Sequence, residues 1–175
     1  MKYSLAIAAL TLVSLSLAGC PPQQVPTPPF DATGTYAGAW TGTQDGDGAK
    51  QEVLECPLTL TLTQNVAAPF PQNFGVQGTA VIDYECFDLP EWLETPPPST
   101  VNVSGVLETN GRLTLLSGAC GTGACVILSL AGAGAQVYNN GTMDTYDGNW
   151  NYAIALAGVA PFGFTGTFTT DRAEE

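Results

Sequence analysis

Short stretches of alternating apolar and polar residues recur along the chain from about residue 34 onward, separated by Gly, Pro and Asn. Alternation with a period of two is typical of a β-strand with one buried face, and the helical spacing of apolar residues is nearly absent. An interruption at Asp147-Gly148-Asn149 allows two shorter strands in place of the seventh. The pattern predicts an all-β protein with eight strands, over residues 34–43, 52–64, 74–86, 100–108, 112–119, 125–133, 142–155 and 162–170.

The same alternation predicts how the second and third strands pair. If they fold back about Pro71, Leu60 faces Ile82 and Cys56 faces Cys86, and the apolar residues share one face. A slip of one residue would invert the faces. Because directly opposed residues have the short Cβ separation of a disulfide, this register predicts a Cys56–Cys86 disulfide.

The fourth and fifth strands meet at Thr109-Asn110-Gly111. A two-residue Asn-Gly turn would put Val103 on the opposite face from Leu113. A three-residue loop with Gly111 in the left-handed region restores one apolar face, and we favour it.

Consecutive hairpins without a helical crossover favour an antiparallel up-and-down meander, and closure into a barrel removes its edges. We therefore predict one eight-stranded β-barrel domain over residues 31–175, with a β-sandwich as the alternative. Four aromatic residues at period-two spacing are expected in its core: Trp150, Tyr152, Phe164 and Phe168.

The first thirty residues predict export. One basic residue, a short apolar run and small residues over 1–19 form a secretory signal. Leu17-Ala18-Gly19-Cys20 resembles the bacterial lipobox, which implies that Cys20 is acylated and begins the mature chain. Residues 20–30 are then the lipidated Cys and a Pro-rich tether, which anchors the protein without spanning the membrane. Pro21 in place of Asp resembles the sorting pattern of outer-membrane lipoproteins, so we expect a bacterial envelope protein on that membrane.

Four cysteines remain after acylation of Cys20, in an oxidising compartment. Since the hairpin register pairs Cys56 with Cys86, it leaves Cys120 with Cys125 across the short Gly-Thr-Gly-Ala loop. That spacing differs from the C-x2-C of redox enzymes, and a metal site would need two further ligands. A second structural disulfide is the prediction.

The composition of the chain disfavours several classes of function. Sixteen acidic residues against four basic ones give a formal net charge of −12, which disfavours binding to nucleic acid or anionic lipid. The chain has no histidine, which removes the commonest general base and most zinc sites. Asp45 begins a Gly-rich stretch that matches a calcium loop at only two ligand positions. We predict no enzymatic activity, no cofactor and no metal.

Gly38-Ala39-Trp40 on the first strand resembles the G-x-W element of lipocalins, and Arg172 stands at the end of the last strand. The pattern is also similar to small lipocalin-like bacterial lipoproteins. The resemblance implies an eight-stranded barrel in which Trp40 closes the base and Arg172 packs over Trp40.

In such a barrel alternate loops share an end, so the loops farthest from the tether would surround any ligand. Tyr84, Trp92, Trp150 and Phe162 are the candidate residues there. Small inward residues such as Gly38, Gly42, Ala80 and Gly105 fit either a cavity or strong coiling of the strands. We therefore expect a lipid-anchored, non-catalytic envelope protein that binds a small apolar ligand. The alternative is a structural or interaction module with a filled barrel whose rim loops bind an envelope protein.

Overall fold

The computed structural model describes residues 26–46, 49–70, 73–87, 99–120, 124–136, 141–156 and 162–174. These residues form eight strands and one 3-10 turn, η1 (Tyr84–Cys86), which follows β3. The strands are β1 (Gly34–Gly46), β2 (Ala49–Phe70), β3 (Asn73–Ile82), β4 (Thr100–Glu108), β5 (Arg112–Cys120), β6 (Ala124–Ala135), β7 (Thr145–Leu156) and β8 (Phe162–Arg172).

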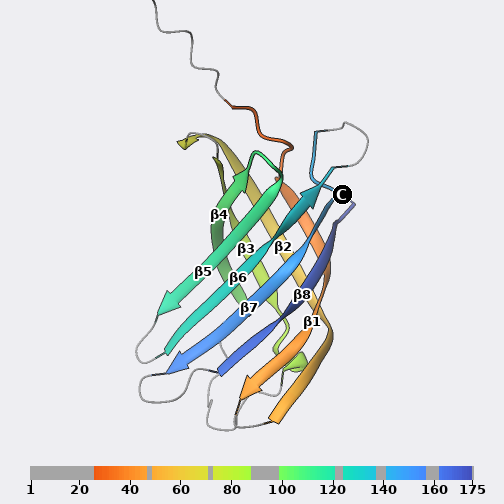
Figure 1. Cartoon of the computed structure of the whole chain (residues 1–175), viewed down its shortest axis with the longest axis vertical. Helices are drawn as coiled ribbons and strands as arrows, with labels where there is room; N and C mark the ends of the chain where they lie inside the picture. The colour runs from red at the N-terminus through yellow and green to blue at the C-terminus, as the bar shows by residue number, and fades with distance from the viewer. Residues whose placement is uncertain are drawn as a thin grey trace, which may run out of the picture.

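The eight strands form a closed antiparallel barrel (Figure 1). Each strand pairs with the next in the sequence, and β8 pairs with β1, so the up-and-down meander closes on itself. Every strand therefore has a hydrogen-bonded neighbour on both sides. The predicted barrel is confirmed and the β-sandwich alternative is wrong. The seventh strand is continuous through Asp147-Gly148-Asn149.

The two ends of the barrel differ in what they carry. The chain enters β1 at one end, where β8 also finishes and where the β2–β3, β4–β5 and β6–β7 connections lie (Figure 1). We call this the tether end. The β1–β2, β3–β4, β5–β6 and β7–β8 connections lie at the other end, which we call the far end. Most of their residues (47–48, 88–98, 121–123 and 157–161) lie outside the described part of the chain.

The predicted β2–β3 register is wrong by two residues. Leu60 pairs with Ala80 rather than with Ile82, and Ile82 pairs with Leu58. A shift of two keeps every side chain on its face, so the apolar pattern alone does not distinguish the two registers. The difference arises because β2 continues to Phe70, with an irregular pairing between Asn65 and Phe70.

The β4–β5 hairpin has the predicted three-residue loop. Leu107 pairs with Leu113, the N–H of Gly111 donates to the carbonyl of Glu108 at 3.0 Å, and Gly111 has a φ of +86°. A left-handed residue at the end of a three-residue loop is the geometry that favours glycine. The β5–β6 register also agrees with the prediction, because Cys120 pairs with Cys125.

Several inward glycines lie where the backbone of a neighbouring strand comes close. A Cβ on Gly166 would lie 2.0 Å from the carbonyl oxygen of Thr41 on β1, and one on Gly132 would lie 1.9 Å from that of Asp147 on β7. The neighbouring backbone occupies the space that a side chain would need. This close approach supports strong coiling of the strands, the second of the two readings of these small residues. Gly38, Gly42, Gly78, Gly105 and Gly148 meet the backbone of a neighbouring strand in the same way.

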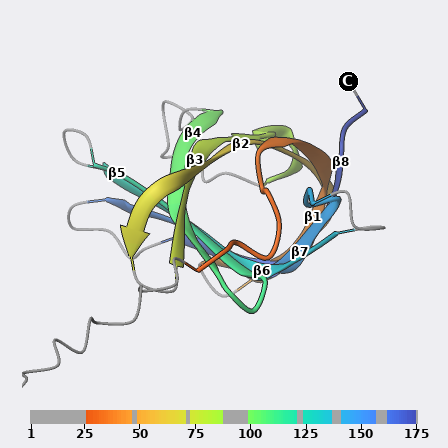
Figure 2. The same cartoon turned by 90° about the horizontal axis from the view of Figure 1, so that it is seen from above.

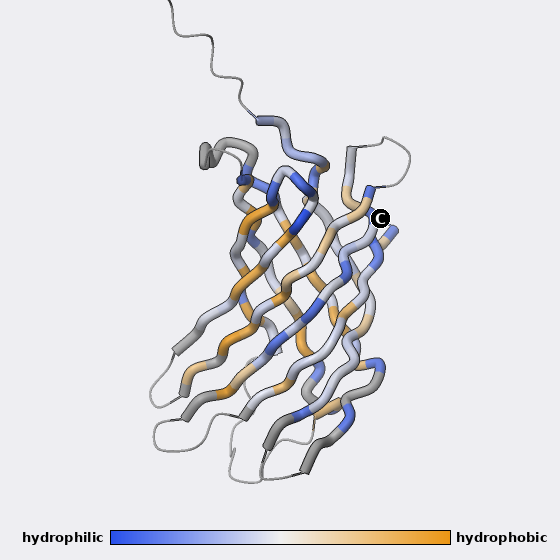
Figure 3. The backbone as a smooth tube through the Cα atoms, viewed as in Figure 1, coloured by the Kyte–Doolittle hydropathy of each residue, from blue (hydrophilic) through white to orange (hydrophobic). Residues whose placement is uncertain are grey.

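Hydrophobic and hydrophilic residues are interspersed along the strands (Figure 3). The burial pattern places the apolar side chains inside the barrel and the polar ones outside. β8 is an example: Phe164, Phe168 and Thr170 are buried, and Thr165 and Thr167 are exposed. The largest fully buried side chains are Trp40, Tyr36, Tyr146, Tyr152, Phe164 and Phe168.

Candidate functional site

An aromatic cluster occupies the far half of the barrel interior. It consists of Trp40 on β1, Trp150 and Tyr152 on β7, Phe164 on β8, and Phe87, which follows η1. The rings of Trp40 and Trp150 lie 4.5 Å apart between centroids, and those of Phe87 and Phe164 also lie 4.5 Å apart, edge to face. Both separations lie in the range that aromatic pairs favour. Trp150 and Phe164 were predicted as core residues, and both are buried.

Phe87 reaches the cluster from the opposite wall. It lies five residues beyond the end of β3 and directly before the undescribed residues 88–98, yet its ring contacts Trp40, Trp150 and Phe164 on β1, β7 and β8. The side chain is 6 % exposed. Phe87 is not among the residues predicted from the sequence, because strand periodicity does not apply after a strand has ended. The sequence signal that could have identified Phe87 is its position as an apolar residue directly after a disulfide-bonded cysteine.

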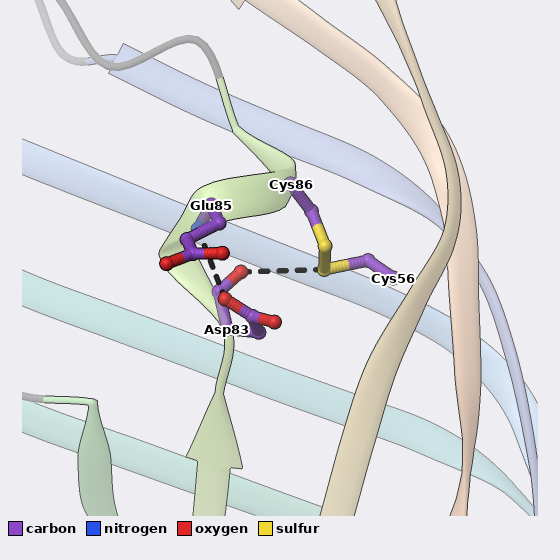
Figure 4. The surroundings of a disulfide bond; sticks show 4 residues. All are labelled: Cys56, Asp83, Glu85 and Cys86. Carbon is purple, nitrogen blue, oxygen red and sulfur yellow. Dashed lines mark hydrogen bonds between the residues drawn. A yellow bond between two sulfur atoms is a disulfide. The ribbon is translucent and has the colours of Figure 1, made fainter.

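The Cys56–Cys86 disulfide fixes the position of Phe87. Cys56 is buried on β2 and Cys86 ends η1, with 5.6 Å between their Cα atoms (Figure 4). The predicted disulfide is confirmed, although Cys86 lies on η1 and not on the paired strand. The turn brings Cys86 back toward β2 despite the two-residue difference in register.

The indole nitrogens of the two tryptophans differ. Nε1 of Trp150 donates to the carbonyl of Thr41 at 3.2 Å. Nε1 of Trp40 is buried and has no acceptor within hydrogen-bonding distance among the described residues. A buried donor without a partner costs about 1–3 kcal/mol, so Trp40 carries an unused hydrogen-bonding capacity inside the cluster.

An N-terminal plug, residues 30–33, closes the tether end. Seen from above, the segment that leads into β1 passes across the opening of the barrel (Figure 2). The N–H of Asp31 donates to the carbonyl of Gly141 at 2.6 Å, and the N–H of Met143 donates to the carbonyl of Asp31 at 2.8 Å. Phe30 and Ala32 are buried, so Phe30, which the sequence assigned to the tether, belongs to the core.

Side chains of the barrel wall hold this plug in place. Oε1 of Gln64 accepts from the N–H of Ala32 at 2.8 Å, and the hydroxyl of Tyr36 donates to the carbonyl of Ala32 at 3.1 Å. The hydroxyl of Thr33 accepts from the N–H of Gln64. The plug is therefore bonded to β1 and β2 as well as to the segment that precedes β7.

Arg172 closes the tether end over Tyr36, and the implied packing over Trp40 is wrong. Its guanidinium lies 5.3 Å from the centre of the Tyr36 ring and donates to the Tyr36 hydroxyl at 3.0 Å. It also donates to the carbonyls of Met143 and Thr33, each at 2.8 Å. The β1–β8 register explains the difference, since it pairs Arg172 with Tyr36 and pairs Trp40 with Phe168.

The other predicted site residues fall partly outside the described structure. Cys20, the signal segment 1–19 and Trp92 lie outside it, and Tyr84 and Phe162 are placed by their backbone alone, in η1 and at the start of β8. The backbone register sets Cys120 opposite Cys125, and Cys125 is disulfide-bonded, while the side chain of Cys120 is not among those described.

Two tyrosines in the tether half of the barrel have altered acidity. Burial raises the pKa of Tyr36 to about 12, although the positive charge of Arg172 opposes this shift. Burial also raises the pKa of Tyr146, whose hydroxyl donates to the carbonyl of Leu113 at 3.0 Å. Neither tyrosine is among the site residues predicted from the sequence. Both are weak candidates for proton transfer at neutral pH, because each keeps its proton.

Within the described ranges, no group of three or more His, Cys, Asp or Glu residues has the arrangement of a metal site. Nor does any described helix have the length and apolar character needed to cross a membrane. Comparisons of this chain with protein-family models, with curated proteins and with solved structures found no match.

Proposed function

We propose that the protein is a lipid-anchored, non-catalytic component of the bacterial cell envelope whose packed β-barrel acts as a rigid interaction module. The packing of the barrel interior carries this proposal. A cavity for a ligand of ordinary size has a volume of about 300 Å3 or more and leaves its lining side chains accessible to a water-sized sphere. The inward side chains of every strand include residues that are almost wholly inaccessible, among them Tyr36, Leu60, Ala80, Leu107, Leu115, Leu130, Tyr152 and Phe164.

Groups outside the strands also occupy both halves of the interior. The N-terminal plug fills the tether end, and Phe87 fills the far half between β1, β7 and β8. These contacts support the filled-barrel alternative over an open apolar pocket.

Exposed apolar residues support an interaction surface in the far half of the barrel. Among the described side chains, the large hydrophobic ones with the greatest exposure are Val81 (42 %), Leu116 (52 %) and Ile127 (50 %). Val81 and Ile127 lie in the far halves of β3 and β6, and Leu116 lies at the middle of β5, which is adjacent to β6. Under the proposal this half faces away from the membrane, because the anchored residue Cys20 precedes the plug by only a short Pro-rich segment.

The non-catalytic part of the proposal rests on composition and on the acidity of the buried groups. The chain has no histidine, and the buried tyrosines Tyr36 and Tyr146 hold their protons more tightly than usual. The proposed membrane contact is the acyl group on Cys20, and the proposed partner is another envelope protein.

Two experiments on the exported chain test the anchor and the interaction surface. Replacing Cys20 by Ser is expected to abolish incorporation of labelled palmitate and to remove the lipid-dependent partitioning into detergent; unchanged labelling would contradict the anchor. A photo-crosslinking amino acid at Ile127 is expected to capture envelope protein. The matched position is Thr109, which is exposed at the tether end. Equal capture from both positions, or none from Ile127, would contradict the proposed surface.

Binding of a small apolar ligand stays a second proposal, in a narrower form. The aromatic cluster with the unpartnered Nε1 of Trp40 favours it. A ligand there would have to replace a side chain that now fills the interior.

A further inference from the structure

Phe87 differs from the other members of the aromatic cluster in how the chain holds it. Trp40, Trp150, Tyr152 and Phe164 lie on strands of the closed barrel and are fixed by its hydrogen bonds. Phe87 follows a three-residue 3-10 turn, and its ring enters the interior from the chain segment beyond β3. It can therefore leave the interior without breaking the strand pairs of the barrel.

The disulfide is the covalent link that keeps Phe87 inside. Cys86 precedes Phe87 directly and is bonded to Cys56, whose side chain is buried in the barrel wall (Figure 4). The backbone at Cys56 is itself set by a β-bulge, since the β1–β2 register shifts between Trp40 and Gly42 and Glu55 takes a left-handed φ of +50°. With the bond intact, Phe87 has little freedom to move.

Removal of Phe87 would leave a small site of defined chemistry. The walls would be the rings of Trp40, Trp150 and Phe164, which contact Phe87 now. These rings favour a flat aromatic molecule, and an apolar cavity of about 150 Å3 is enough for a single ring. Nε1 of Trp40 lies buried without an acceptor among the described residues, whereas a ligand with a carbonyl or ether oxygen could accept from it.

We infer that Phe87 occupies a binding site for a small neutral aromatic molecule with one hydrogen-bond acceptor, and that the Cys56–Cys86 disulfide controls access to it. A dithiol opens the site by reducing the disulfide: two electrons and two protons pass to the sulfurs of Cys56 and Cys86, and the dithiol becomes a disulfide. This inference deepens the second proposal and rests on it. It is independent of the anchor on Cys20 and of the partner-binding surface.

The test uses the full chain in detergent, with acetophenone as the probe and ethylbenzene as the matched molecule without an acceptor. Binding is measured by ligand-observed NMR and by tryptophan fluorescence. The oxidised protein is expected to bind neither probe. After reduction with dithiothreitol it is expected to bind acetophenone about 2- to 13-fold more tightly than ethylbenzene, the equivalent of one ordinary hydrogen bond.

Three variants separate the site from its control. Oxidised Phe87→Ala is expected to bind acetophenone without reductant, and so is Cys56→Ser/Cys86→Ser. Cys120→Ser/Cys125→Ser is expected to behave as the wild type, because this variant keeps the Cys56–Cys86 disulfide that holds Phe87 in place.

Each result decides part of the inference. If folded Phe87→Ala, checked by circular dichroism, binds neither probe, there is no aromatic site. If it binds while the reduced wild type does not, the disulfide does not control access; this comparison holds even if the Cys56→Ser/Cys86→Ser variant fails to fold. Binding by the oxidised wild type would show that Phe87 does not block the site. None of these results bears on the Cys20 labelling or Ile127 crosslinking experiments.

Discussion

Burial raises the pKa of two tyrosines, Tyr36 and Tyr146, and this makes the stability of the barrel sensitive to alkaline pH. In the unfolded chain a tyrosine loses its proton near pH 10, whereas in the folded barrel Tyr36 keeps its proton to about pH 12. Between these values the unfolded state binds fewer protons than the folded state, so stability falls as the pH rises. The contribution of the two raised tyrosine pKa values to the stability of the folded state is fully present below pH 10.

The Tyr146→Phe variant tests this dependence. It is expected to lose about 0.5–1.5 kcal/mol at pH 7, because the hydrogen bond to the Leu113 carbonyl is removed. Above pH 10 its free energy of unfolding is expected to fall less steeply than that of the wild type, since the variant lacks one of the two tyrosines with a raised pKa. Urea unfolding at a series of pH values measures both effects. An identical slope for the two proteins would show that Tyr146 does not keep its proton in the folded state.

Glu55 is a second residue whose backbone has a measurable consequence. Its φ of +50° lies in the left-handed region, which costs a residue with a Cβ about 1–2 kcal/mol and costs glycine nothing. Glu55→Gly is therefore expected to stabilise the protein by up to about 1 kcal/mol.

Glu52→Gly is the control for this substitution. Glu52 is exposed on the same strand and carries the same charge, and it is not among the residues with positive φ. Glycine there is expected to cost about 0.5–1 kcal/mol, because extended backbone gains nothing from the loss of Cβ. If both variants lose stability equally in urea unfolding, Glu55 does not store backbone strain.

At the scale of elements, the N-terminal plug is the part of the fold that most needs a test. Phe30 is buried against Gly134 and Met143, next to the hydrogen bonds that join Asp31 to Gly141 and Met143. Phe30→Ala is expected to lower the free energy of unfolding by about 2–4 kcal/mol, since it leaves a cavity near the edge of the core.

Thr27→Ala, three residues earlier on the same segment and exposed, is expected to change stability by less than about 0.5 kcal/mol. If Phe30→Ala is as stable as Thr27→Ala, the segment is not part of the folded core and the tether end is open.

The elements also show how far the sequence determines the fold. Alternation predicted all eight strands, because each has one buried face, and the loop at Gly111 predicted the β4–β5 register. The β2–β3 register was wrong by two residues, since alternation is unchanged by an even shift and β2 runs on to Phe70. The pattern determined the faces, and the connections determined the registers.

The candidate site was predictable only where its residues lie on strands. Trp40, Trp150 and Phe164 follow the alternation and are buried as expected. Phe87 and Phe30 lie outside the strands, where no periodicity applies, and they close the two halves of the interior. The predicted contact of Arg172 with Trp40 was wrong. It came from a family resemblance, whereas the β1–β8 register pairs Arg172 with Tyr36.

For the whole molecule, the structure combines a closed wall with buried inward side chains on every strand. All eight strands are paired with both neighbours, although the β4–β5 pairing extends only from Ser104 with Leu116 to Leu107 with Leu113. Closure leaves few backbone groups with which an outside strand could pair, so contacts with other molecules are expected mainly from outward side chains and from the loops. This is why the proposed function depends on the exposed residues of the far half, and why a ligand inside the barrel requires Phe87 to move.

Native mass spectrometry of the oxidised full chain, purified in detergent, tests the filled barrel most directly. A filled barrel predicts the mass of the chain alone, with no apolar molecule retained at one copy per chain and none added when a fatty acid or an aromatic probe is titrated. A stoichiometric apolar molecule that stays bound to the folded chain and is released on unfolding would contradict the packed interior and restore ligand binding as the primary function.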